Sequence, residues 1–210
     1  MKQDLKKHID NLMARGATYV DARWYPYEET NSLLMWNGNL KDLSASSQSG
    51  VGVRVLYRGA WGFSAASSLE DPAAIFDKAL DNARTAAERV DFPVRLAEKD
   101  VYQASFTSPN LIDPFTVPLT EKLEFLRMMD AKLNQPGVAQ RVAALDFVKK
   151  QIIFLDSEGS EIEKTIIDVF PSFQVMGIDK DGEMQARKYK SARHGSTRGW
   201  ESLDPAYFSS

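Results

Sequence analysis

The 210-residue sequence contains no cysteine and only two histidines, His8 and His194. Without cysteine a chain has neither a disulfide framework nor a thiolate nucleophile, and this composition is typical of a cytoplasmic protein. A zinc site takes three or four His, Cys or carboxylate ligands, often with two at close helical spacing. We therefore expect no metal ligands in this chain, and we interpret His8 as a surface residue of an amphipathic helix.

A surplus of one charge and long apolar runs are also absent. Lys and Arg total 26 against 29 Asp and Glu, a net charge of −3, whereas a dedicated nucleic-acid-binding protein usually carries a basic surplus. No run of about 18 apolar residues suggests a membrane span, and residues 1–16 lack the apolar core of a secretory signal. The 43% of hydrophobic residues is ordinary for a soluble globular protein.

Hydrophobic periodicity predicts the order helix, strands, helix, connector, helix, strands. This order is typical of an α+β fold with antiparallel or mixed sheets and packed helices, and it raises the hypothesis of an internal structural duplication. Helices are expected at 2–15, 71–89 and from 120 to before Pro136, and a β-meander at 31–68. Further strands are expected at 19–27, 101–106, 138–149, 151–156, 161–170, 172–178 and 184–190.

Turn residues mark the expected hairpins. Asn37-Gly38 is a strong hairpin signal, because both central residues of a type I′ turn need positive φ. Arg58-Gly59 and the pair Gly50 and Gly52 are expected to be further turns, as are residues 157–160 and 179–182.

Other residues predict where the elements end. Pro26 favours a strand end or a sheet edge. Asp71 and Pro72 are an acidic N-cap and a proline at the first helical position, and Thr120 is the expected cap of the third helix.

Four prolines interrupt the periodicity of residues 91–119, at positions 93, 109, 114 and 118. The sequence is therefore divided into a helix–meander–helix unit (1–92), an extended connector (93–119) and a helix followed by antiparallel strands (120–210). We interpret these parts together as the N-terminal domain of a longer protein.

The segment KYKSARHGSTRGWE, residues 188–201, gathers five potential cations in eleven positions beside Tyr189 and Trp200. Such a segment can hold the acidic side chains or the carboxylate of a peptide against an aromatic wall. The candidate substrate-binding residues are Arg193, His194, Arg198 and Trp200. The competing interpretation is a solvated strand end and loop, in which Lys and Arg are common.

Several motifs resemble the TldD/PmbA family, zinc metallopeptidases once called modulators of DNA gyrase. In order they are NGNLK, SASS, GVGVRV and GAWGFSA in residues 37–65, then PLTEKLEFLRMMD, LDSEGSEI and STRGWE. The last segment is more similar to the TldD branch than to the PmbA branch.

The resemblance implies an N-terminal α+β domain followed by a β-rich domain, and a His-Glu-x-x-x-His helix that binds zinc further along the full-length protein. It also implies extended or unfolded peptides as substrates, and a homo- or heterodimer with a family paralogue. Because those ligands are missing here, we expect a non-catalytic N-terminal portion that ends early, at Ser210. The alternatives are a metal-free, PmbA-like binding or assembly subunit and, with less support, a protein-level modulator of DNA gyrase.

Overall fold

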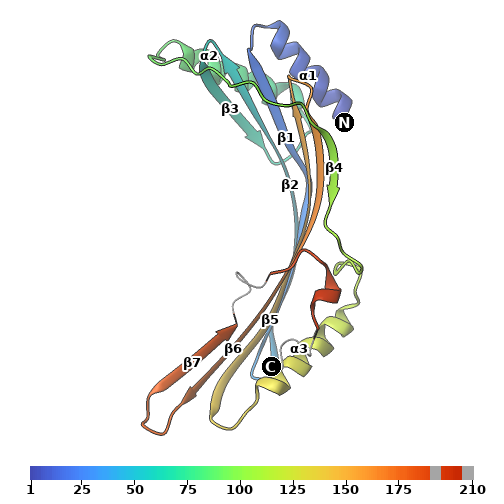
Figure 1. The fold of residues 1–210 in the computed structure, drawn as a ribbon, viewed down its shortest axis with the longest axis vertical. Coiled ribbons are helices and arrows are strands. Elements are labelled where there is room, and N and C mark those ends of the chain that lie inside the picture. Colours follow the sequence, from blue (N-terminus) through green and yellow to red (C-terminus); the bar gives the residue numbers. More distant parts are fainter. Residues whose placement is uncertain (190–194, 205–210) are drawn as a thin grey trace. The chain divides into compact units, whose positions relative to one another are not determined.

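The computed structural model describes residues 1–189 and 195–204. Its helices are α1 (Lys2–Ala14), α2 (Pro72–Ala87) and α3 (Leu119–Leu133), with a short 3-10 helix η2 (Trp200–Ser202) (Figure 1). The strands are β1 (Tyr19–Trp36), β2 (Asn39–Tyr57), β3 (Ala60–Ala66), β4 (Gln103–Thr107), β5 (Val138–Asp156), β6 (Glu161–Ile178) and β7 (Met184–Tyr189).

The strands form a seven-stranded sheet in the order β3-β2-β1-β5-β6-β4, and β7 also pairs with β6. The β2–β3 and β6–β7 pairs are antiparallel. The short strand β4 pairs with β6 in parallel, with Gln103 opposite Glu161. These pairings confirm the predicted α+β class, and the parallel pair makes the sheet mixed.

Four strands are longer than predicted, and the breaks expected inside them are wrong. β1 continues through Pro26, and β2 contains both Gly50 and Gly52. β5 is one strand across residue 150, and β6 is one strand across Pro171. In the sheet order each of these strands has a neighbour on both sides for at least part of its length, and this pairing outweighs the local breaking signals.

The hairpin signals at Asn37-Gly38 and Arg58-Gly59 are confirmed. The φ angles are 48° and 78° in the first turn and 49° and 80° in the second, so all four residues have the positive φ of a type I′ turn. Gly52 has a different role, since a Cβ there would lie 3.3 Å from the Phe63 ring, which packs over this glycine.

One helix cap is confirmed and one is wrong. The Asp71 side chain accepts a hydrogen bond from the backbone N–H of Ala74 at 3.0 Å, as predicted for an N-cap. The N-cap of α3 is Pro118, which makes no side-chain cap, so Thr120 lies inside the helix. Pro118 fits this position because a helix start needs no N–H from its first residues.

The chain divides into two compact units. Unit 1 consists of Met1–Glu28, Gln48–Thr107 and Lys150–Thr165; unit 2 consists of Glu29–Ser47, Ser108–Lys149 and Ile166–Ser210. Both units draw on β1, β2, β5 and β6. The sequential division at residues 92 and 120 stays a prediction.

In unit 1, helices α1 and α2 pack on one face of the strands. Ile9 of α1 and Phe76 of α2 are fully buried against strand residues such as Val53. His8, interpreted from the sequence as a surface residue, is partly exposed, and its ring stacks on Phe76 with 5.3 Å between centroids. Side chains alternate along a strand, so Tyr19, Asp21, Arg23 and Tyr25 of β1 project to the opposite face, the open face of unit 1.

Unit 2 has its own core beneath α3. Leu126 and Met129 of the helix pack against Leu145 and Phe147 of β5 and Val169 of β6. These residues are at most 2% exposed. Burial of these helix residues in the core explains the hydrophobic periodicity that predicted the third helix.

Candidate functional site

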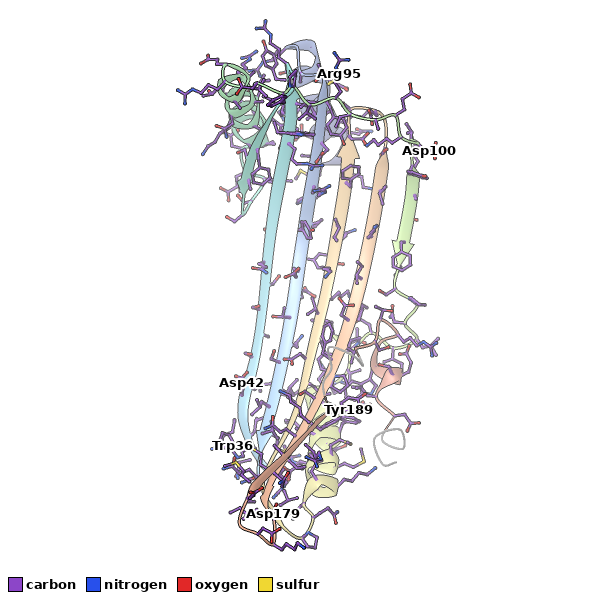
Figure 2. All side chains as sticks on the ribbon, turned by 60° about the vertical axis from the view of Figure 1, so that its left-hand side comes forward. Trp36, Asp42, Arg95, Asp100, Asp179 and Tyr189 are labelled. Atoms are coloured by element: carbon purple, nitrogen blue, oxygen red, sulfur yellow. The ribbon has the colours of Figure 1, made fainter. Side chains whose placement is uncertain are left out.

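A free sheet edge in unit 2 is the first candidate for a functional surface. β3 pairs only with residues 51–57 of β2, and no described strand lies beside residues 39–47 on the side away from β1. All of residues 39–47 are exposed, including Leu40 and Leu43 at 43% and 49%. Figure 2 shows Asp42 on this outer strand at the margin of the sheet.

The composition of this edge leaves it open to pairing. An unpaired edge presents a row of N–H and C=O groups, and proteins usually protect such edges with proline, lysine or a bulge. Residues 39–47, NLKDLSASS, contain no proline and a single lysine. The inner side is fixed to β1, where the hydroxyls of Thr30 and Ser46 lie 2.7 Å apart. The edge can therefore accept an extended backbone by strand addition.

The turn that begins this edge is anchored to the body of unit 2. The buried carboxylate of Asp130 accepts a hydrogen bond from the Gly38 N–H at 3.0 Å and pairs with Arg141 Nε at 2.9 Å. Asn37 and Arg141 also exchange hydrogen bonds, Asn37 N–H to Arg141 C=O at 3.0 Å and Arg141 N–H to Asn37 Oδ1 at 2.8 Å. These contacts hold the start of the edge in one conformation.

The predicted cluster in residues 188–201 is only partly visible. Arg193 and His194 lie outside the described residues. Arg198 is exposed, and its backbone N–H donates to Ser196 Oγ at 3.1 Å. Trp200 packs on the unit 2 core, with its ring centroid 5.9 Å from that of Phe125 and 6.0 Å from that of Phe147. The two described candidates therefore have different surroundings, and their role in binding stays a prediction.

Next to Trp200, Glu201 performs a role that the sequence did not indicate. Its carboxylate accepts the backbone N–H groups of Leu111 at 2.7 Å and Ile112 at 3.0 Å. Burial opposes ionisation of this group, but the two N–H donors outweigh it, so the pKa of Glu201 is lowered. Glu201 therefore fastens the connector to the end of the described chain in unit 2.

On the open face of unit 1, two buried carboxylates are neutralised by cations. Asp21 is 1% exposed and receives Arg54 Nη2 at 2.6 Å. Asp156 receives Lys99 Nζ at 2.6 Å, and Lys99 also lies 5.1 Å from the centre of the Tyr19 ring. Burial raises the pKa of Tyr19, and the nearby Asp21 carboxylate adds to this shift.

Sequence patterns did not identify these pairs, because each joins residues of different elements. Beside them lies a pocket of about 230 Å³, lined by Tyr19, Arg54, Trp61, Leu96, Ala97, Lys99 and Glu158. The Arg54 guanidinium also lies 5.2 Å from the centre of the Trp61 ring. Both cations that line this pocket, Arg54 and Lys99, therefore already make contacts within the protein.

The described residues do not suit a zinc ion. Among residues 1–189 and 195–204, no group of three or more His, Cys, Asp or Glu side chains is arranged to hold a metal. In the same part of the chain, no helix combines the length and the apolar composition needed to cross a membrane.

Comparison with known proteins gives two matches to family models. The PmbA/TldA metallopeptidase domain 1 matches residues 25–87, and the PmbA/TldA metallopeptidase central domain matches residues 112–209. A metalloprotease of Methanocaldococcus jannaschii is 29% identical over 165 residues, 75% of this chain and 35% of its own length. A metalloprotease of Methanothermobacter thermautotrophicus is 29% identical over 178 residues, 83% of this chain and 37% of its own length. The chain thus spans about a third of the length of these relatives.

Three solved structures share the fold. A proposed modulator of a DNA gyrase from Thermotoga maritima has a TM-score of 0.77 at 16% identity, covering 100% of this chain and 46% of that protein. A proposed modulator of DNA gyrase from Bacteroides thetaiotaomicron has a TM-score of 0.72 at 12% identity, covering 90% and 44%. TldE from Thermococcus kodakarensis has a TM-score of 0.56 at 13% identity, covering 87% and 43%. Together with the two family models, which cover most of the sequence, this shared fold leads to one conclusion: the chain belongs to the PmbA/TldD family.

Proposed function

We propose that this chain is the N-terminal, non-catalytic portion of a zinc metallopeptidase of the PmbA/TldD family, and that it binds extended peptide segments. The family models and the relatives named metalloproteases support the peptidase assignment. The sequence contains neither a His-Glu-x-x-x-His motif nor a cysteine, and His8 packs on Phe76 within unit 1. Hydrolysis would then depend on residues supplied elsewhere in the full-length protein.

The free edge of β2 at residues 39–47 is the observation that carries the binding role. Strand addition uses main-chain hydrogen bonds, so it gives affinity without demanding a particular sequence. The small serine and alanine side chains of residues 44–47 leave room for varied side chains on the added strand. This mode of recognition selects peptides that can become extended and therefore favours unfolded segments over folded ones.

The proposal predicts that the 210-residue chain by itself neither hydrolyses peptides nor retains stoichiometric zinc, while it still binds unfolded peptides. The measurements are elemental analysis after dialysis, cleavage of a quenched fluorescent casein peptide with and without EDTA, and anisotropy of a labelled, cleavage-resistant peptide. EDTA-sensitive cleavage by the purified chain would refute the non-catalytic assignment. Absence of peptide binding would refute the binding role.

A proline scan of residues 41–45 tests the edge itself. The backbone N–H groups of a strand alternate between its two sides. Prolines at every second position therefore form two sets: one removes only N–H groups that point away from β1 (the outward set), and the other removes only N–H groups that point toward β1 (the inward set). We expect the outward set to keep the fold and to weaken peptide binding about tenfold, as expected for the loss of one or two net hydrogen bonds. The inward set should lower stability by breaking the pairing with β1.

A peptide N-methylated at alternate residues is the matched control on the ligand side, because it keeps the side chains and loses half of the backbone donors. Circular dichroism of every variant separates unfolding from loss of binding. If folded variants of both sets bind the peptide as tightly as the unsubstituted chain, the edge is not the binding site.

A metal-free assembly subunit, paired with a catalytic paralogue, is the second candidate. This candidate would bind peptides at the same edge of β2. The two candidates differ only in whether the full-length protein contains zinc ligands. Zinc analysis of the full-length protein alone and with its paralogue discriminates the two, because only the first candidate binds zinc by itself.

A further inference from the structure

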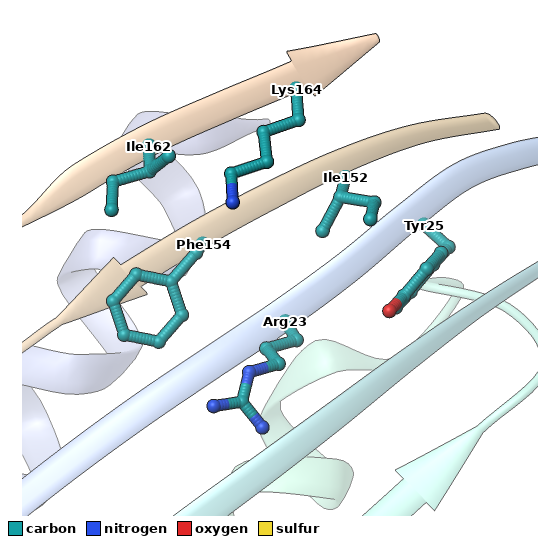
Figure 3. Close-up of a pocket in the computed structure, with 6 residues that line it drawn as sticks. All are labelled: Arg23, Tyr25, Ile152, Phe154, Ile162 and Lys164. Atoms are coloured by element: carbon teal, nitrogen blue, oxygen red, sulfur yellow. The ribbon is translucent and has the colours of Figure 1, made fainter. Parts of the chain in front are cut away.

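A second pocket on the open face of unit 1 encloses about 360 Å³. Its lining comes from three adjacent strands: Arg23 and Tyr25 of β1, Ile152 and Phe154 of β5, and Ile162 and Lys164 of β6. Figure 3 shows the six side chains on the near face of the strands, with helices behind them. The pocket therefore lies on the sheet face opposite the helical core.

The pocket combines apolar and cationic groups. Ile152, Phe154 and Ile162 are half-buried and form the apolar part, while Arg23 and Lys164 are exposed. The Arg23 guanidinium lies 5.5 Å from the centre of the Phe154 ring, a contact that holds the cation over an apolar surface. A ligand in this pocket would meet positive charge and apolar area together.

The positive charge of the pocket is not neutralised within the described part of the chain. The nearby carboxylates of Asp21 and Asp156 already pair with Arg54 and Lys99, and Glu158 also binds Lys99 at 3.2 Å. No described carboxylate pairs with Arg23 or Lys164. Charge complementarity therefore favours an anionic ligand.

The sheet geometry indicates which kind of carboxylate fits. Peptide C-termini are commonly captured by clusters of free backbone N–H groups. β5 lies between β1 and β6, so its backbone N–H groups point toward neighbouring strands in the plane of the sheet. The pocket therefore has no free backbone N–H groups from β5 and binds anions only through side-chain cations. This arrangement suits the side-chain carboxylate of an Asp or Glu within a peptide better than the carboxylate of a peptide C-terminus.

We propose that this pocket binds an acidic side chain next to an apolar residue in an extended polypeptide, with Arg23 and Lys164 facing the carboxylate. The apolar neighbour would pack on Phe154 and Ile162. The identity of the ligand as a peptide rests on the proposed function. The preference for an acidic residue rests on the pocket alone.

The test compares two amidated, acetylated peptides that differ only in a central Leu-Glu-Leu or Leu-Gln-Leu sequence. We expect the unsubstituted chain to bind the Glu peptide roughly fivefold more tightly at low salt, with the difference lost near 1 M salt. The double variant R23Q/K164Q should remove this difference and leave binding of the Gln peptide unchanged. Both side chains are exposed, so the variant should fold.

The matched control is K78Q/R89Q, which removes the same charge from exposed positions on and just after α2, away from the open face. Equal affinity for both peptides, or equal losses in the two double variants, would overturn the pocket proposal while leaving peptide binding intact. Absence of binding by both peptides would instead count against the proposed function. The chain could also associate with itself in a concentration-dependent way that R23Q/K164Q abolishes. This result would show that the open face of unit 1 binds a second copy of the chain, and it would overturn the proposal.

Discussion

Replacing Gly62 with alanine is expected to destabilise the protein by about 3 kcal/mol, the upper part of the range for overpacked cores. Gly62 lies in β3 directly beneath α2. A Cβ at this position would lie 2.2 Å from both the Ala79 carbonyl oxygen and the Ala83 nitrogen. Both are backbone atoms of a helix, so no rotamer change can relieve the contact, and α2 has to move off the sheet.

The measurement is the free energy of unfolding in urea together with the melting temperature, which should fall by roughly 6–12 °C for a chain of this size. Gly50→Ala is the matched control, because a Cβ at this β2 position meets its nearest atom, the Ala66 carbonyl oxygen, at an ordinary 3.5 Å. We expect the control to be neutral or slightly stabilising, since glycine inside a strand costs about 0.5–1 kcal/mol relative to alanine. Equal stability of both variants would show that α2 does not pack as described.

Substituting Asp156 with alanine is expected to cost about 2–4 kcal/mol, because it removes a buried carboxylate that pairs with Lys99 and leaves the backbone N–H groups of Glu158 and Ser160 without their acceptor. The Asp156 side chain is 0% exposed. One oxygen receives Lys99 Nζ, and the other accepts the N–H groups of Glu158 at 3.0 Å and Ser160 at 2.9 Å. The carboxylate thus closes the turn between β5 and β6 and attaches the connector to it.

The same group makes stability depend on pH. Burial raises the pKa of Asp156, but the hydrogen bonds from Lys99 and Ser160 outweigh burial, so the pKa is lowered on folding. Its stabilising contribution is therefore complete above the unfolded pKa of about 3.9 and is lost as the pH falls through the lower folded pKa. We expect the stability gap between the unsubstituted chain and Asp156→Asn to be constant near pH 6 and to narrow below about pH 4.

Urea unfolding at a series of pH values measures this gap. Glu158→Ala is the control, since Glu158 is exposed and is only the second, 3.2 Å partner of Lys99. Its stability should stay within about 0.5 kcal/mol of the unsubstituted chain. If the stability difference between the unsubstituted chain and Asp156→Asn increases as the pH falls, the negative charge of Asp156 does not stabilise the fold as proposed.

Local signals predicted features that a few neighbouring residues determine. Asn37-Gly38 predicted its turn because positive φ is a property of those two residues. Asp71 predicted the start of α2 because an N-cap bonds a residue only three positions away. Residues 179–182 form the expected turn, where Asp179 Oδ1 accepts the N–H groups of Asp181 and Glu183.

Predictions failed where distant strands decide the outcome. Pro26 and Pro171 did not end their strands, because β1 and β6 are held by strands on both sides, including β5 beside β1 and β4 beside β6, which lie far away in the sequence. The candidate Trp200 belongs to an aromatic cluster with Phe125 and Phe147, a contact across more than 50 residues that no spacing rule describes. Of the other candidates, only Arg198 lies in the described part of the chain, as an exposed residue.

The sequence by itself determined the α+β class, the turns at 37–38, 58–59, 157–160 and 179–182, the family resemblance and the shortage of zinc ligands, because these follow from composition and from contacts within a few residues. Only the tertiary structure decided that residues 39–47 are a free edge, since this depends on β3 being too short to cover them. It also brought Arg23, Phe154 and Lys164 into one pocket. The turn residues encode which consecutive strands form hairpins, but the pairing of β1 with β5 and of β4 with β6 joins distant segments, and no local pattern encodes it.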